Sequence, residues 1–170
     1  MLQLSTARMD FQRYTEADLE QIARLVTNPD VMHYIGDGQV KDKTYARELL
    51  TRMQEQYENF EDFGLHKLVL KETGDMVGHA GIVAQIIDDA FEIELGYWLF
   101  PEFWGHGYAM EAAEALLHYA IEELELERVI SVIQIENTAS INIAKKNGMH
   151  LEKTIVHEGK DVHVYCWKAE

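Results

Sequence analysis

The chain has 170 residues, and its 30 acidic against 15 basic side chains give a formal net charge of −15 at neutral pH. This length suits one domain, residues 1–170, with a hydrophobic core of its own. The negative charge repels nucleic-acid backbones, and the longest basic cluster, Lys145-Lys146, is too small to offset it. The composition therefore argues against a nucleic-acid partner. The acidity itself favours solubility, or a cationic acceptor such as a polyamine or basic peptide.

Cysteine usage and the N-terminus bear on the compartment. Cys166 is the only cysteine, so neither an intramolecular disulfide nor a cysteine metal site can form. No apolar run approaches the roughly 20 residues needed to span a bilayer. The first ten residues lack the basic start and long apolar segment of a signal peptide. We therefore expect a cytoplasmic protein with no membrane association.

The first half of the chain carries local signals for helices and strands. Thr15 is a helix N-cap candidate with Asp18 three residues on, and Asn28-Pro29-Asp30 interrupts the helix that follows. Short runs that alternate apolar and polar side chains indicate strands. The elements expected here are a strand over 4–14, helices over 15–27 and 43–58, and strands over 65–71, 76–85 and 91–99.

The second half contains the clearest helix. Its apolar face is made of residues at three- and four-residue spacing, namely Ala109, Ala112, Ala113, Leu116, Ala120 and Leu124. The elements expected are a helix over 106–124, a strand over 129–135, a helix over 137–148, and strands over 149–156 and 162–167. This order predicts an α/β (α+β) domain, with a mixed sheet covered by helices on both faces.

A glycine turn at 101–109 lies directly between a predicted strand and the long helix. Gly105 and Gly107 allow a tight turn with no Cβ in the way, and the first turn of the helix offers unpaired N–H groups. A diphosphate suits such a site, although two glycines can also simply form a loop. A Rossmann fingerprint would need glycine at Met110, and no Gly-Lys-Ser/Thr follows to form a P-loop.

Two segments at this point resemble a known family. The run 94–99 (ELGYWL) followed by 103–112 (FWGHGYAMEA) is similar to the acetyl-CoA signature of the GNAT superfamily. The segments 137–140 (NTAS) and 146–149 (KNGM) agree with it, at the right separation along the chain. Within the superfamily, the resemblance is to the RimJ/RimL type, which acetylates ribosomal-protein N-termini. It spans nearly the whole chain.

The resemblance implies a fold and an activity. The fold would be the acyl-CoA N-acyltransferase (GNAT) fold, with a mostly antiparallel central sheet of seven strands, as many as are expected above. Acetyl-CoA would be the co-substrate, with no metal, and its acetyl group would pass directly to a primary amine in a ternary complex. The acceptor would be a protein N-terminus or a small molecule, and relatives of this type commonly pair as homodimers. A non-catalytic acyl-CoA-binding regulator is the alternative.

The resemblance also assigns cofactor-binding positions. The pantetheine arm would bond to backbone at 98–100, and the diphosphate to the glycine turn. The residues concerned are Trp98, Leu99, Phe100, Trp104, Gly105, His106, Gly107, Tyr108, Ala109, Asn137, Asn142 and Lys146. Two positions depart from the family. Glu102 stands where Gln or Arg is common, so it should point to solvent, and Ala144 replaces the Tyr that often protonates the leaving thiolate.

Glu94 and Ser140 are the catalytic candidates. Glu92, Glu94, Gly96 and Trp98 share one face of the strand, where a glutamate is costly unless it is bonded or faces a cleft. Glu94 could therefore deprotonate the amine through a water, or make a structural salt bridge. Ser140 could donate to the leaving sulfur or bond to its own helix backbone.

The acceptor pocket is expected between the first two helices, the 32–38 turn and the closing hairpin. Its candidate lining is Tyr34, Tyr45, Phe60, Phe63 and Trp98, although ordinary core roles compete. The eight histidines show no metal-ligand spacing, so no metal site is predicted.

Overall fold

Seven strands form one sheet in the order β1-β2-β3-β4-β5-β7-β6 in the computed structural model, which describes residues 1–170. The strands are β1 (Met9–Arg13), β2 (Gly64–Leu70), β3 (Met76–Ile87), β4 (Ala90–Leu99), β5 (Arg128–Gln134), β6 (His150–His157) and β7 (Lys160–Lys168). All neighbours are antiparallel except β4 and β5, which are parallel. The predicted mixed, mostly antiparallel sheet is confirmed.

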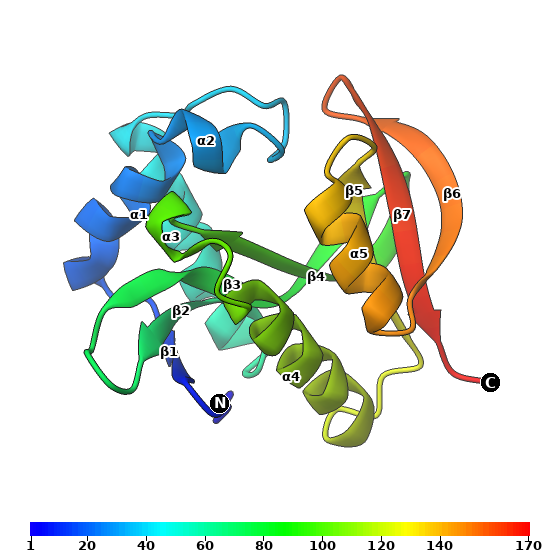
Figure 1. The fold of residues 1–170 in the computed structure, drawn as a ribbon, viewed down its shortest axis with the longest axis horizontal. Helices are drawn as coiled ribbons and strands as arrows, with labels where there is room; N and C mark the ends of the chain where they lie inside the picture. The colour runs from blue at the N-terminus through cyan, green and yellow to red at the C-terminus, as the bar shows by residue number, and fades with distance from the viewer.

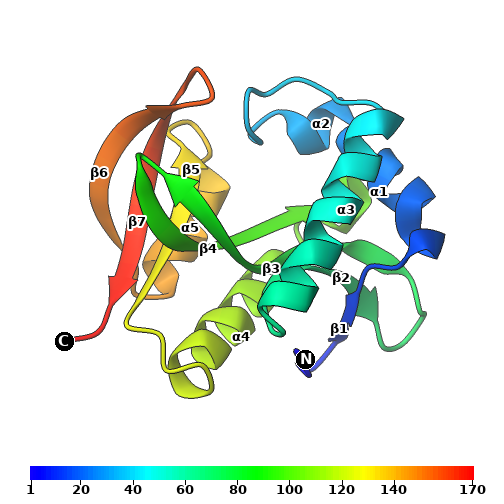
Figure 2. The same cartoon turned by 180° about the vertical axis from the view of Figure 1, so that it is seen from behind.

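The helices cover both faces of the sheet, as predicted (Figures 1 and 2). They are α1 (Leu19–Val26), α2 (Pro29–Met32), α3 (Lys43–Asn59), α4 (Tyr108–Glu122) and α5 (Thr138–Lys146), with short 3-10 turns η1 (Glu16–Asp18) and η2 (Pro101–Phe103). The helices α4 and α5 lie on one face, and α1 and α3 lie on the other. No helix combines the length and the apolar character needed to cross a membrane.

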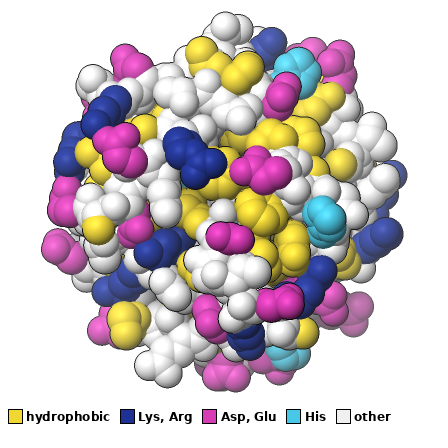
Figure 3. All heavy atoms as spheres, turned by 60° about the vertical axis from the view of Figure 1, so that its left-hand side comes forward, with side chains coloured by type: hydrophobic (Ala, Val, Ile, Leu, Met, Phe, Trp, Pro, Cys, Tyr) yellow, Lys and Arg dark blue, Asp and Glu magenta, His cyan; other side chains and the backbone are white.

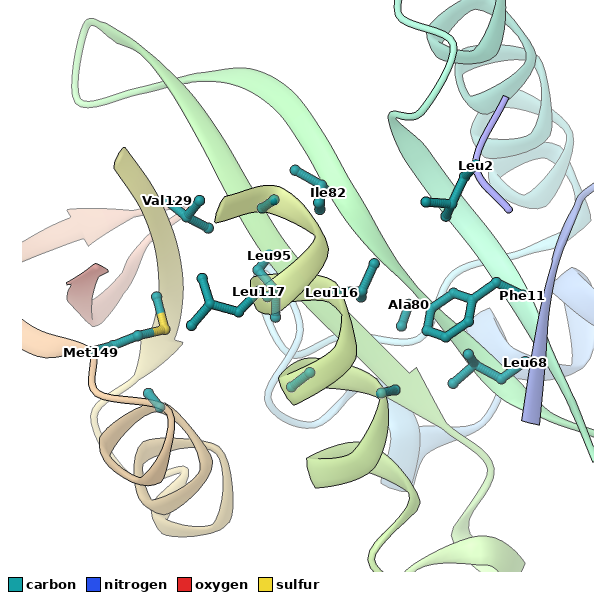
Figure 4. Packing of buried hydrophobic residues seen from close by; sticks show 14 of the residues in the cluster. Leu2, Phe11, Leu68, Ala80, Ile82, Leu95, Leu116, Leu117, Val129 and Met149 are labelled. Carbon is teal, nitrogen blue, oxygen red and sulfur yellow. The ribbon is translucent and has the colours of Figure 1, made fainter. Parts of the chain in front are cut away.

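The main hydrophobic core lies between α4 and the sheet. Leu116 and Leu117 of α4 pack with Ile82 of β3 and Leu95 of β4 (Figure 4). The cluster extends to Phe11 at one end of the sheet and, through other side chains, to Met149 next to β6. A second cluster, under α1 and α3, fixes the opposite face. Strand β4 is thus held from both sides, which makes it a rigid platform.

The first strand is shorter than expected. Strand β1 begins at Met9, because the chain turns at 6–9, where the Thr6 N–H donates to the Met9 carbonyl at 2.8 Å. The preceding segment folds back, with a bridge between Ser5 and Asp10. The prediction of one strand over 4–14 was therefore wrong, because side chains of this turn bond to α4 instead.

Helix boundaries follow local chemistry. Thr15 and Asp18 form the predicted capping box, with the Thr15 N–H donating to the Asp18 carboxylate at 2.8 Å. The Asn28-Pro29 break itself starts the extra helix α2, because the Asn28 side chain caps it and proline suits its first position. Helix α4 begins at Tyr108, two residues later than predicted, because Gly107 adopts a left-handed φ of 80°.

Strands β4 and β5 separate soon after they meet. Their ladder contains one residue pair, Glu94 with Ile130, and the Ser131 hydroxyl then donates to the Leu95 carbonyl at 2.9 Å. The Phe100 N–H points the other way and donates to the Val77 carbonyl at 2.9 Å. Because amides alternate along a strand, those of Tyr97 and Leu99 face the gap that opens between β4 and β5.

Glu92 and Glu94 illustrate the two outcomes expected for a carboxylate on this strand. Glu92 is buried and accepts hydrogen bonds from Nε and Nη2 of Arg128, both at 2.9 Å. Arg128 also binds Glu152 of β6 at 2.7 Å, so one guanidinium joins three strands. Glu94 makes no such pair and lines the gap.

We expect Glu92→Gln to lower the free energy of unfolding by about 2 kcal/mol, because a buried charge-assisted hydrogen-bond pair is lost. Urea unfolding followed by circular dichroism measures it. Glu152→Gln removes a more exposed partner of the same guanidinium and should cost less than about 1 kcal/mol. Equal losses in the two variants would contradict the structural role assigned to the buried pair.

Candidate active site

The glycine turn has the geometry of an anion-binding helix start. Gly105 and Gly107 both have left-handed φ, 78° and 80°. The first helical hydrogen bond of α4 is donated by the Glu111 N–H to the Gly107 carbonyl, so the three preceding N–H groups have no acceptor in the helix. The Trp104 indole N–H donates to the Leu99 carbonyl at 2.9 Å and fastens the turn to the end of β4. These features make an open, positively polarised surface.

A cavity of about 480 Å³, here called the turn cavity, lies against this surface. One wall comes from the end of β4, the glycine turn and α4, and it includes Leu99, Trp104, Gly105, Gly107, Tyr108, Ala109 and Met110. The opposite wall comes from α2 and the residues after it, including Val31, His33 and Tyr34. Most of the lining is apolar, as expected for the arm of a large ligand. The face that brings α1 and α2 forward shows apolar side chains gathered centrally, with charges of both signs around them (Figure 3).

Arg8 supplies a positive charge at the same helix start, which the sequence analysis did not assign. Its guanidinium lies 4.2 Å from the centre of the Tyr108 ring. Its Nε donates to a Glu111 carboxylate oxygen at 2.9 Å, and Thr6 donates to the other oxygen at 2.6 Å. Burial alone would raise the pKa of Glu111, but these hydrogen bonds outweigh it and lower that pKa. The Arg8–Glu111 ion pair therefore holds the turn at 6–9 against the start of α4, next to the glycine turn.

A second cavity of about 340 Å³, here called the gap cavity, fills the opening between β4 and β5. Its walls come from the 34–36 segment, one face of α3, strands β3 to β5, α5 and the tip of the β6–β7 hairpin. It shares seven residues with the turn cavity: Tyr34, Ile35, Tyr97, Trp98, Asn137, Ser140 and Ile143. The two cavities thus meet at the end of β4, where a ligand in one can react with a ligand in the other.

Glu94 lies in the gap cavity and forms no salt bridge, so the cleft is the one of the two predicted alternatives that the structure shows. Burial raises the pKa of Glu94 from 4.5 to about 7, the Val132 N–H offsets part of this rise, and the negative charge of Glu158 adds to it. A carboxylate with a pKa near neutrality can accept a proton and release it again, which is what a general base requires.

Tyr97 is the functional candidate that the sequence analysis missed. Alternation placed Tyr97 on the opposite face from Glu94, yet both line the gap cavity because the open edge of β4 is reached from either face. Burial raises the pKa of Tyr97 to about 12, an increase that the Ser140 side chain partly offsets, and both residues line both cavities. Tyr97 therefore stays protonated at neutral pH and can donate a proton. Its place after Gly96 in the family-like motif was the one available signal.

Ser140 and Asn137 lie at the start of α5, as predicted. The Asn137 side chain caps the helix by accepting the Ser140 N–H at 3.3 Å, and its amide donates to the Ser140 hydroxyl at 3.1 Å. Both residues line both cavities. Ala144, one turn further along, lines the gap cavity. The Ser140 hydroxyl is therefore held by Asn137 at the place where the two cavities meet.

Trp98 separates the two cavities and is held firmly. Its ring packs on buried His79 with centroids 4.5 Å apart, and His79 Nδ1 bonds to the Tyr14 hydroxyl at 2.7 Å. Burial lowers the pKa of His79 to about 3, so the ring beneath Trp98 is neutral. The wall that the two cavities share is thereby preorganised.

Several predicted positions lie away from the cavities. The Phe100 side chain is buried in the second core, and both its N–H and its carbonyl are used in bonds to Val77 and Phe103, so its backbone has no group free for a cofactor. His106 is exposed on the turn without lining either cavity, and neither Asn142 nor Lys146 lines one. All four positions were assigned from the family resemblance. The Phe100 side chain lies in the core, and the other three residues are exposed to solvent.

Three of the five aromatic residues predicted for the acceptor pocket line the gap cavity. Tyr34, Tyr45 and Trp98 line the gap cavity, whereas Phe60 and Phe63 lie outside it and stack on each other at 5.4 Å. Glu102 is exposed near Arg24 at 3.8 Å, as its unfavourable charge predicted. Cys166 lines neither cavity, and no cluster of three His, Cys, Asp or Glu side chains can hold a metal ion.

Comparison with known proteins decides the family. The model of the acetyltransferase (GNAT) domain matches residues 8–150. The chain belongs to the GNAT acetyltransferase family. The matched range includes the glycine turn, both catalytic candidates and Arg8, so the GNAT resemblance seen in the motifs is confirmed.

Relatives of this GNAT chain agree in sequence and in fold. YkkB of Bacillus subtilis is 37% identical over 147 residues, which cover 85% of this chain and 83% of YkkB. The crystal structure of an acetyltransferase from Agrobacterium tumefaciens superimposes with a TM-score of 0.83 at 27% identity and covers 98% of this chain and 94% of that one. RimL, the ribosomal L7/L12 α-N-protein acetyltransferase solved with coenzyme A, has a TM-score of 0.78 at 18% identity, over 96% of each chain. The resemblance to the RimJ/RimL type is thus supported at the level of the fold.

Proposed function

We propose that this GNAT protein transfers an acetyl group from acetyl-CoA to a primary amine, with the cofactor in the turn cavity and the amine in the gap cavity. One observation carries the proposal. A cavity against an anion-binding helix start meets a second cavity that contains a carboxylate of near-neutral pKa. The coenzyme A found on RimL agrees with this use of the fold.

Each part of the cofactor has a counterpart in the protein. The N–H groups at the start of α4, together with the nearby Arg8 guanidinium, suit the diphosphate. The apolar walls of the turn cavity suit the pantetheine arm. The amides of Leu99, which lines the turn cavity, and of Tyr97, which lines both cavities, would bond to that arm where the cavities meet. When bound, acetyl-CoA supplies an activated thioester carbonyl.

The chain's own groups then handle the protons. Glu94 accepts a proton from the amine, directly or through a water, so that the nitrogen lone pair is free to attack the carbonyl carbon. As the new C–N bond forms and the C–S bond breaks, the Tyr97 hydroxyl gives a proton to the departing sulfur. The nitrogen then gives up its second proton to the Tyr97 oxygen, which restores the hydroxyl. Ala144 provides no hydroxyl on α5, and Tyr97 takes over that task from β4.

A matched pair of glycine variants tests the cofactor site. Gly105 and Gly74 both have φ of 78°, and a Cβ added at either meets no atom within 4 Å. We expect Gly105→Ala to weaken acetyl-CoA binding at least about tenfold in calorimetry, or about 1.4 kcal/mol, because its Cβ occupies the diphosphate path. Gly74→Ala, in the β2–β3 turn, carries the same backbone strain and should leave the affinity unchanged. Equal affinities in the two variants would place the cofactor elsewhere.

The competing function is an acyl-CoA-binding regulator without catalysis. Incubation with labelled acetyl-CoA and a panel of amines distinguishes the two. Bound coenzyme with no labelled product from any amine would favour the regulator.

A further inference from the structure

The gap cavity contains a second carboxylate that the transfer reaction does not use. Glu158 stands at the tip of the β6–β7 hairpin, where its φ of 50° is left-handed. One of its carboxylate oxygens lies 2.6 Å from the position that a Cβ on Gly36 would take, so the carboxylate packs against the 34–36 segment. Figures 1 and 2 show the hairpin tip on the same side of the molecule as the α2–α3 connection.

Glu158 has no ion-pair partner in the protein. It makes no ion pair and no side-chain hydrogen bond, although two lysines are nearby. Lys41, whose charge acts on Glu158 from beyond ion-pair distance, is paired with Asp37 at 2.8 Å, and Lys160, with its Cε near Gly38, forms no ion pair. The carboxylate is therefore available to a ligand in the cavity.

Glu94 and Glu158 act on each other across the cavity. The charge of Glu158 contributes to the raised pKa of Glu94, so the two carboxylates repel. The remaining charged lining residue is Arg52 of α3. It lies one turn before Gln56, whose side chain bonds to Ala84 of β3. It forms no ion pair with Glu94 or with Glu158. A ligand with two positive groups would neutralise both carboxylates.

The walls favour a small ligand over a polypeptide. The Gln134 side chain donates to the Gly36 carbonyl at 2.9 Å, which ties the 34–36 segment to β5. Glu158 packs against the same glycine, so this side of the cavity is bridged twice. The volume of about 340 Å³ accommodates a short aliphatic amine.

We propose that the acceptor is a small diamine, whose reacting amine lies at Glu94 and whose second, cationic amine is held by Glu158. This inference rests on the proposed acetyl transfer and narrows its substrate class. The second ammonium need not lose its proton, whereas the first must. The excess negative charge of the whole chain would attract such a cation to the cavity.

The test compares α,ω-diamines of three to six carbons with monoamines of the same length. We expect the wild-type protein to prefer the best diamine over its matched monoamine by about three- to fivefold in kcat/KM, the effect of one solvent-exposed charge pair. Glu158→Gln should reduce this preference to nearly one. Because both amines use Glu94, the ratio cancels any change that the variant causes there. Added salt should weaken the preference as well.

Asp161→Asn is the matched control, because Asp161 is exposed on the same hairpin and lines neither cavity. It removes the same charge and should keep the preference. A wild-type preference near one, or a preference that survives Glu158→Gln, would overturn the diamine assignment. Acetyl-CoA binding with turnover of neither amine would also overturn it while sparing the cofactor site. Failure to bind acetyl-CoA would instead refute the proposed function itself.

Discussion

Replacement of Glu94 by glutamine should lower kcat/KM for the amine by about 100-fold, the lower end of what a general base contributes. Glutamine keeps the size and the hydrogen-bonding capacity of the side chain but cannot take the proton. Steady-state kinetics at pH 8 measures the loss. The affinity for acetyl-CoA should stay the same, since Glu94 lines only the gap cavity.

The pH dependence identifies the group responsible. Because the pKa of Glu94 is about 7, wild-type kcat/KM should rise with pH up to about 7 through ionisation of this carboxylate. Glu94→Gln should lack this step and keep only the titration of the amine. A variant that retains both the rate and the step would exclude Glu94 as the base.

The raised pKa of Glu94 also affects stability. Activity should rise as Glu94 ionises, whereas the stability of the fold should fall. The folded protein holds a proton on Glu94 up to pH of about 7, while the unfolded chain releases it near 4.5. Stability that is present below pH 4.5 is therefore lost as pH rises through 7. At pH 8, Glu94→Gln should unfold at a higher urea concentration than wild type. At pH 5, the difference between the two midpoints should be smaller. The proposed base thus lies at a position where its ionised form destabilises the fold.

Replacement of Tyr97 by phenylalanine should lower kcat at least about tenfold, because the departing sulfur loses its proton donor. The KM for acetyl-CoA should change little, since the aromatic ring and the strand amide remain. Single-turnover kinetics with saturating acetyl-CoA separates this step from binding.

Ser140→Ala provides the comparison for Tyr97. If Ser140 only positions the Tyr97 hydroxyl, its loss should cost less than Tyr97→Phe, and the double variant should resemble Tyr97→Phe alone. A larger loss in Ser140→Ala than in Tyr97→Phe would make the serine the proton donor, one of the two roles predicted for it from the sequence.

Much of this fold could be predicted from the sequence, because its helix caps and turns are formed by residues that are close along the chain. Thr15 and Asp18 bond within one turn of each other, and Asn137 bonds to Ser140, so both helix starts were visible as motifs. Gly105 and Gly107 marked the turn before α4, because only glycine adopts their backbone angles without strain. Glu94 stood out because an ionisable group on a buried strand requires a partner or a cleft. In each case the neighbours that matter lie within a few positions along the chain.

Tertiary structure decided the rest. Arg8 meets Glu111, and Glu158 meets Gly36, across more than 100 positions, and no local pattern encodes such contacts. Tyr97 joined the site only because β4 and β5 separate after Glu94, a divergence set by the packing of whole elements. Phe100 lies outside both cavities for a similar reason, since its N–H donates to the Val77 carbonyl of β3. The sequence thus determined which groups carry the chemistry near each turn and cap, while the three-dimensional packing of distant segments determined which of them face one another.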